Sequence, residues 1–135
     1  MKVSAKVAAA IKDISEIKAE VYKAAKEEIP LPPIKYLFFL ERVTTDYDEI
    51  AREYGKYDAL VKNNRSAQFV SLQVEAEKLG NKFEKGIAEI KAEGLVAEER
   101  ITRNYFEALK DSTEKLIQTL KVHLDIFKQT PGSTF

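Results

Sequence analysis

The fold is decided by residues 34–62, which read IKYLFFLERVTTDYDEIAREYGKYDALVK. Apolar and tyrosine side chains recur in this stretch at gaps of three or four residues, at positions 36, 40, 43, 47, 50, 54, 57 and 61. This spacing follows the turn of an α-helix and places those side chains along one face. The stretch therefore predicts an amphipathic helix that packs lengthwise against other helices.

Three further stretches have the same period. Residues 4–28 carry one narrow stripe, formed by Val7, Ala10, Ile14, Ile17, Val21 and Ala24. In residues 66–93 the stripe is formed by Phe69, Leu72, Ala76, Leu79, Phe83, Gly86 and Ile90. In residues 96–128 it includes Tyr105 or Phe106, Leu109, Thr113, Leu116, Leu120, Leu124 and Phe127. The sequence therefore predicts four helices.

Proline, asparagine and glycine set the expected ends of these helices. The three prolines within residues 30–33 must interrupt any helix, because proline lacks an amide N–H and clashes with the preceding turn. We expect a second break at residues 63–65, which read Asn-Asn-Arg, and a third at Gly94. Gly80-Asn81 is a candidate cap and turn. However, the stripe stays in phase across it, so we favour one continuous helix there.

No sheet pattern competes with the helices, since the sequence has no Asn-Gly or Asp-Gly turn and no sustained alternation. Short connections make consecutive helices antiparallel. We therefore predict an all-α protein, an elongated antiparallel (up-down) four-helix bundle of helical hairpins with coiled-coil-like packing. Residues 1–130 are expected to form a single helical-bundle domain, and residues 131–135 a flexible C-terminal tail.

Composition excludes several functions. The 135 residues include 22 Lys or Arg and 22 Asp or Glu, so the chain has no excess positive charge with which to bind nucleic acid. It has no cysteine and one histidine, His123, which excludes cysteine chemistry and metal sites that need two imidazoles. No apolar run approaches the roughly 20 residues of a membrane span. We expect no integral membrane segment.

Candidate catalytic and metal-binding patterns also fail. Residues 46–49, Asp-Tyr-Asp-Glu, resemble the start of a calcium loop but lack its glycine and its final glutamate. We interpret them as an acidic cluster at a helix N-terminus, where Thr44 or Thr45 is a candidate cap. His123 is expected to be a partly buried helix residue. The sequence thus predicts no enzyme, no catalytic residue, no cofactor and no metal ligand.

The first turns of the second predicted helix have more apolar surface than one face of a helix can bury. Residues 36–40 point in nearly every direction around the axis. Three interpretations stay open. The proline-rich loop covers this end, or Phe38 or Phe39 faces another chain, or the helix ends hold a lipid or a small apolar ligand. The interface candidates are Tyr36, Leu37, Phe38, Phe39, Tyr54 and Tyr57.

These patterns favour a non-enzymatic structural or assembly protein that self-associates, or packs into a larger protein complex, through the aromatic patch. One alternative is a regulatory adaptor or inhibitor that binds a different protein. Another is an amphipathic carrier of lipid or an apolar ligand, although the charge pattern gives no support for lipid. The chain shows no signal-peptide pattern. We therefore expect it in the cytoplasm, or incorporated into an assembled particle or filament.

Overall fold

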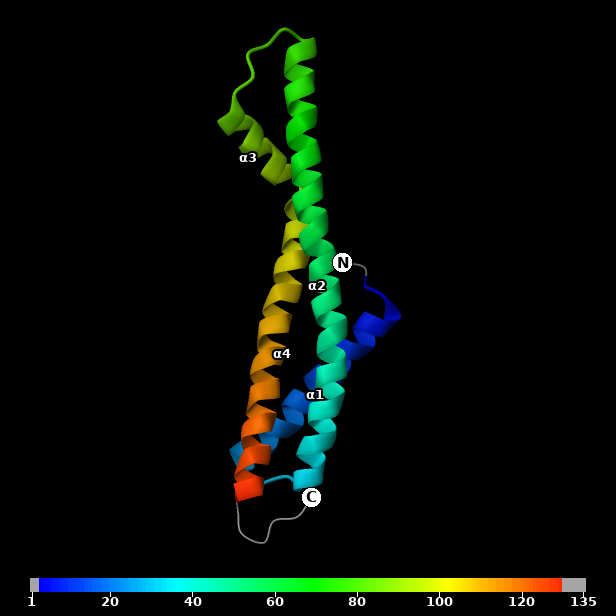
Figure 1. Cartoon of the computed structure of the whole chain (residues 1–135), viewed down its shortest axis with the longest axis vertical. Helices are drawn as coiled ribbons and strands as arrows, with labels where there is room; N and C mark the ends of the chain where they lie inside the picture. The colour runs from blue at the N-terminus through cyan, green and yellow to red at the C-terminus, as the bar shows by residue number, and fades with distance from the viewer. Residues whose placement is uncertain (1–2, 130–135) are drawn as a thin grey trace. The chain divides into compact units, whose positions relative to one another are not determined.

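A computed structural model describes residues 3–129, of which 89% are helical, and no strand occurs among them (Figure 1). Its helices are α1 (Ala5–Glu27), α2 (Pro33–Lys78), α3 (Lys85–Leu95) and α4 (Ala97–Gln129). The prediction of an all-α helical bundle with four helices is confirmed. The tail predicted at residues 131–135 lies outside the described residues.

The chain divides into two compact units. Unit 1 consists of residues 1–53 and 107–135, and unit 2 of residues 54–106. Helices α2 and α4 contribute to both units, because each continues without interruption past the residue at which the units divide. That residues 1–130 form a single domain stays a prediction.

The two ends of α1 are both capped by local hydrogen bonds. Ser4 is the N-cap, and its Oγ accepts a hydrogen bond from the amide of Val7 at 3.2 Å. At the other end Glu28 has a left-handed φ of 55°, and the amide of Ile29 donates to the carbonyl of Ala24 at 3.1 Å. After the proline-rich connection, α2 begins at Pro33, one residue before the predicted start, because proline is well suited to the first position of a helix.

In unit 1, α1 runs antiparallel to α2. Lys6 near the start of α1 pairs with Glu49 at 3.2 Å, whereas Glu20 near its end pairs with Lys35 at 3.7 Å. The stripe predicted for α1 is buried at every position, which confirms it. The buried side chains of α1 are Val7, Ala10, Ile14, Ile17, Val21 and Ala24.

The second half of α4 completes unit 1 and also runs antiparallel to α2. Near the start of α2, Tyr36 stacks on His123, with ring centroids 4.7 Å apart and planes 11° apart. Eleven residues further along α2, the Tyr47 hydroxyl donates to Glu114 Oε1 at 2.5 Å. The predicted core of this part of α4 is confirmed, since Thr113, Leu116, Leu120 and Leu124 are buried.

The break predicted at residues 63–65 is wrong, because α2 is helical through this segment and ends at Lys78. Two asparagines cost a helix only a few tenths of a kcal/mol each relative to better helix formers. Neither proline nor glycine interrupts the segment, and Val61, two residues before it, is buried. The weak local preference of two asparagines is therefore not enough to end the helix.

The continuous helix favoured across Gly80-Asn81 is also wrong, and the cap is the correct alternative. Gly80 has a φ of +70°, which glycine adopts without strain. Its amide donates to the carbonyl of Glu77, and the amide of Asn81 donates to that of Ala76 at 2.9 Å. These two bonds are the Schellman ending of a helix. The predicted stripe is therefore interrupted, and Leu79 and Ile90 are exposed.

Unit 2 is formed by the second half of α2, by α3 and by the first turns of α4. Tyr57 of α2 stacks on Phe106 of α4, with ring centroids 5.8 Å apart. Glu93 of α3 pairs with Arg65 of α2 at 2.9 Å and with Arg100 of α4 at 2.5 Å. Only Val96 separates α3 from α4. Glu93 therefore links all three helices of this unit.

Among residues 3–129, no helix combines the length and the apolar content needed to cross a bilayer.

Candidate functional site

The aromatic patch predicted as an interface is largely part of the core of unit 1. Tyr36 is 2% exposed and packs on His123 and on Phe127 of α4. Phe39 is 3% exposed, and the charged ends of Lys35 and Arg42 lie over its ring at 5.5 and 5.9 Å. The chain's own helices and cations cover both rings. Neither Tyr36 nor Phe39 is therefore available to a partner, which corrects their assignment as interface residues.

The other four interface candidates are more accessible, but the structure does not bring them together into one patch. Phe38 is 55% exposed, and Leu37 beside it is half-buried. Tyr54 and Tyr57 are half-buried residues of unit 2, where Tyr57 takes part in the stack on Phe106. Phe38 is thus the one strongly exposed ring of the predicted set, and a single phenylalanine is a small surface for a stable interface.

The expectation for His123 agrees with its position. The side chain is half-buried on α4, and its ring lies against Tyr36. In the part of the chain that the structure describes, no three or more His, Asp or Glu side chains group together in a way that could hold a metal ion.

A charged cluster joins α1 to α2 in unit 1, and sequence reasoning missed it. Arg42 donates a hydrogen bond to the carboxylate of Asp13, which also interacts with Asp46. Burial and the hydrogen bond with Asp13 raise the pKa of Asp46 to about 7, whereas the pKa of Asp13 is lowered by its hydrogen bonds to Asp46 and Arg42. The two carboxyl groups therefore share a proton near neutral pH.

Residues 46–49 lie in the middle of α2, so the predicted helix N-terminus at this point is wrong. Thr44 and Thr45 do not cap a helix, because their hydroxyls donate to the carbonyls of Leu40 and Glu41 one turn earlier. The acidic residues instead act between helices. Glu49 pairs with Lys6 of α1, and this contact lowers the pKa of Glu49.

A hollow of about 530 Å³ lies between α1 and α4 in unit 1. Lys18 Nζ donates to Ser112 Oγ at 2.7 Å, linking the two helices at this hollow. Its remaining charged lining has both signs, with Asp111 beside Lys115. This mixture does not select a ligand of either charge, and we assign the hollow no site.

The outer face of α3 is the clearest unpartnered surface of unit 2. This helix turns its small residues inward, since Ala88 and Ala92 are 5% and 0% exposed. Its large residues point outward, with Ile87 50% and Ile90 74% exposed. We define the α3 outer face as Gly86, Ile87, Ile90 and Gly94. A helix that packs only within its own chain normally has the opposite arrangement, with the large apolar residues inside.

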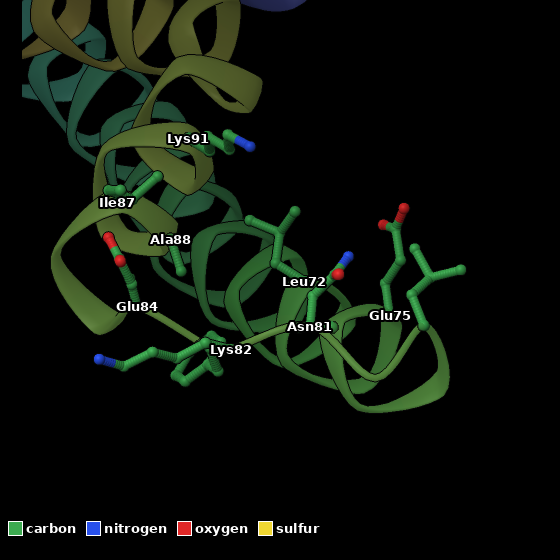
Figure 2. A pocket seen from close by; sticks show the side chains of 11 residues that line it. Leu72, Glu75, Asn81, Lys82, Glu84, Ile87, Ala88 and Lys91 are labelled. Carbon is green, nitrogen blue, oxygen red and sulfur yellow. The ribbon is translucent and has the colours of Figure 1, made fainter.

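A hollow of about 330 Å³ with a mixed polar and apolar lining adjoins this face (Figure 2). Its lining side chains come from the end of α2, the following loop and α3, and they include Leu72, Phe83 and Ile87. Phe83 is held in place by an edge-to-face contact with Phe69, with ring centroids 5.6 Å apart. The charged side chains of the lining are balanced, as two are acidic and two basic: Glu75, Glu84, Lys82 and Lys91. Like the hollow between α1 and α4, it does not select a ligand of either charge.

Sequence reasoning placed Gly86 and Ile90 in a core stripe, and the structure places them outside. The signal that distinguishes the two assignments is the opposite stripe, Ala88 and Ala92, which has the same period but smaller side chains. Periodicity alone does not say which of two apolar stripes faces inward.

Comparison with known proteins gave no relative: no family model, no curated protein and no solved structure matches the chain.

Proposed function

We propose that this chain is a non-enzymatic assembly protein that associates with copies of itself, or with a larger protein complex, through the apolar surface of unit 2. One observation carries the proposal: α3 buries its alanines and exposes its isoleucines. Fully burying an isoleucine contributes about 1.5–3 kcal/mol relative to leaving it in water. Covering Ile87 and Ile90 with a partner therefore contributes favourably to the free energy of association.

The balance of buried and exposed apolar residues over the whole of unit 2 supports the proposal. It has five buried apolar residues, namely Val61, Ala88, Ala92, Val96 and Phe106. It exposes nine large ones, namely Leu60, Val70, Val74, Leu79, Ile87, Ile90, Leu95, Ile101 and Tyr105. Scattered exposed apolar residues are normal on a protein surface. A unit with more large apolar side chains outside than apolar side chains inside favours burial against another chain.

The proposed interface is on α3, whereas the sequence predicts an interface at the aromatic residues 36–40, near the start of α2. Two of the predicted interface rings, Tyr36 and Phe39, are buried in unit 1, and substituting them tests folding rather than association. Of the candidates predicted from the sequence, Phe38 remains exposed.

Sedimentation velocity over a wide range of concentrations tests the proposal. We expect the wild-type chain to sediment as a dimer or larger species, and Ile90→Asp to sediment as a monomer, because a buried unpaired carboxylate opposes association. Val122→Asp is the matched control, since Val122 is 55% exposed on α4 in unit 1. It should associate like the wild type. Circular dichroism checks that both variants remain helical.

Two results would contradict the proposal in this form. If Ile90→Asp associates as strongly as Val122→Asp, the α3 outer face is not the contact. If the wild-type chain is monomeric at every concentration, it does not self-associate, and an adaptor that binds a different protein becomes the better hypothesis.

A further inference from the structure

We infer that the contact between Asp13 of α1 and Asp46 of α2 is a pH-sensitive switch, which holds α1 against α2 below neutral pH and loosens α1 above it. The inference concerns unit 1 alone, so it does not depend on the function proposed for unit 2. It stands on three observations: the placement of the two carboxyl groups, a buried oxygen of Asp46, and the way in which α1 is attached.

The two carboxyl groups meet where α1 packs on α2. Asp13 and Asp46 share a hydrogen bond. Such a bond needs a proton on one of the two groups, because an ionised carboxylate has no hydrogen to donate. Arg42 donates to Asp13, which favours the ionised form of Asp13. Asp46 is therefore the group that carries the proton and donates it to the bond.

The second oxygen of Asp46 makes its ionised form unfavourable while α1 is in place. Among residues 3–129, no group forms a hydrogen bond with Asp46 Oδ2, which is buried. A buried carboxylate without a donor is costly, because its charge has been taken out of water and nothing replaces the water. Movement of α1 away from Asp46 would return this oxygen to solvent. Ionisation of Asp46 therefore favours a looser α1.

Solvent reaches the pair while α1 is in place. A hollow of about 260 Å³ adjoins the two carboxyl groups, and its lining includes Asp13, Asp46, Arg42 and Thr45. Protons can therefore enter and leave without unfolding of unit 1, as a reversible switch requires.

The charges around Asp46 oppose its ionisation overall. The charged groups that act on it are two carboxylates, Asp13 and Glu49, and one guanidinium, that of Arg42. Further charged groups act on the neighbours of Asp46 or line the adjoining hollow, namely Lys6 and Glu16 of α1, Glu41, Asp48 and Arg52 of α2, and Asp111 and Glu114 of α4.

The proton is released close to neutral pH. Burial and the hydrogen bond with Asp13 raise the pKa of Asp46 to about 7, whereas its ordinary value is 3.8. With α1 in place Asp46 thus binds a proton that it releases once α1 has moved away. A raised pKa of this kind stabilises the closed arrangement at pH 6, and the stabilisation is lost as the pH rises through 7.

Among the helices of unit 1, α1 is the one that can move with the least loss of packing. Residues 28–32 join it to α2 and are not helical. Two of its six buried side chains are alanines, which bury little area. Its ion pairs with α2 through Lys6 and Glu20 involve exposed side chains, and such pairs contribute about 0–1 kcal/mol each.

Hydrogen exchange at pH 6 and pH 8, in dilute protein, tests the inference. After correction for intrinsic rates, protection of residues 5–27 should fall by about five- to tenfold between the two pH values. One linked proton changes the opening equilibrium by about tenfold over this range, and partial exposure of the group reduces the effect. Residues 107–129 of α4 should change by less than about twofold, because α4 stays packed on α2.

Three substitutions to asparagine show whether the pair is responsible. Asp46→Asn removes the titrating group, so α1 should be equally protected at both pH values. Asp13→Asn removes the second carboxyl group and should reduce the response to less than about twofold. Asp48→Asn is the matched control, since it removes the same charge from an exposed position of α2 two residues away and should respond like the wild type. Circular dichroism checks that all three variants remain helical.

Three results would overturn the inference. The first is equal protection of α1 at pH 6 and pH 8 in the wild type. The second is a pH response that is the same in Asp46→Asn, Asp13→Asn and Asp48→Asn. The third is an equal loss of protection in α1 and in residues 107–129, because the pair would then affect the stability of unit 1 as a whole without loosening α1 separately. A fall confined to α1, abolished by Asp46→Asn and kept in Asp48→Asn, supports it.

Discussion

At the scale of single residues, Phe38 and Phe39 are neighbours in the chain with opposite surroundings. Phe39 is 3% exposed beneath Lys35 and Arg42, whereas Phe38 is 55% exposed. The composition of residues 36–40 predicts an apolar surplus, but it does not identify which ring remains outside. That depends on the rotation of α2 against α1 and α4, which only the packed structure shows.

Replacing each phenylalanine with alanine should show that the two rings contribute differently to stability. We expect Phe39→Ala to lower the free energy of unfolding by about 3–5 kcal/mol, because it removes a buried ring and leaves a cavity. Phe38→Ala, the matched control, should change it by less than about 1 kcal/mol. Chemical denaturation followed by circular dichroism measures both. Equal losses in the two variants would show that the assignment of Phe39 to the core is wrong.

The Asp13–Asp46 pair should make unit 1 less stable as the pH rises through neutrality. Asp46 has a folded pKa of about 7, above its ordinary value of 3.8, so the folded chain binds a proton that the unfolded chain releases. The stabilisation from this proton is therefore present at pH 5 and is lost as the pH rises through 7. Above that pH, both carboxylates are ionised beside Arg42, and Glu49 adds to the repulsion.

Replacing Asp46 with asparagine tests this expectation, because the amide can donate a hydrogen bond to Asp13 at every pH. At pH 8 we expect Asp46→Asn to be more stable than the wild type by roughly 1 kcal/mol, after allowing for screening of a partly exposed group. At pH 5 the two should be nearly equal. Thermal melts across this range measure the difference. A wild-type melting temperature that stays flat between pH 5 and 8 would contradict the shared proton.

Sequence reasoning could not anticipate this pair. Asp13 and Asp46 belong to different helices, and each is an ordinary acidic residue in its local sequence. Only the antiparallel register of α1 on α2, visible in the Lys6–Glu49 and Lys35–Glu20 pairs, brings the two carboxyl groups together.

At the scale of elements, the sequence predicted helices well where one apolar stripe was unambiguous. The stripe of α1 is buried at all six predicted positions, because no second apolar stripe on that helix competes with it. The prolines of residues 30–33 likewise separate α1 from α2 at the expected place. A steric rule that excludes a helix is stronger than a propensity that disfavours one.

The same comparison explains the two errors in the third predicted helix. Asn63 and Asn64 only weakly disfavour a helix and do not break it, whereas Gly80 ends it. Leu79 and Phe83 continue one stripe in the sequence, yet Leu79 is exposed after the helix ends, and Phe83 reaches Phe69 from a loop. Apolar spacing can therefore stay in phase across a turn by coincidence. The left-handed φ of Gly80 shows the turn, and the sequence does not display φ.

At the scale of the whole molecule, the two units differ in how much apolar surface they bury. Of the described residues, unit 1 contains 13 of the 18 buried apolar side chains, whereas most of the large exposed ones belong to unit 2. Local stability follows buried apolar packing. Unit 2 is therefore expected to open more readily than unit 1.

Hydrogen exchange along α2 tests this expectation within a single continuous helix. Amides of residues 54–78 should exchange faster than those of residues 34–53, once intrinsic rates are corrected, because fewer buried side chains hold the second segment. Mass spectrometry of dilute protein resolves the two segments. Raising the protein concentration should slow exchange in the second segment if the chain self-associates through unit 2 as proposed. Equal protection throughout α2 in dilute protein would contradict the difference between the units.

The division of the chain has a consequence for its synthesis. Unit 2 is one continuous stretch of sequence, but unit 1 combines residues 1–53 with residues 107–135. As the polypeptide is synthesised, α1 and the first half of α2 are complete before unit 2 is made, whereas the half of α4 that belongs to unit 1 follows unit 2. Segments that stay uncovered during translation are prone to mispairing and aggregation. The side of unit 1 that packs against α4 is therefore completed only after all of unit 2 has been made.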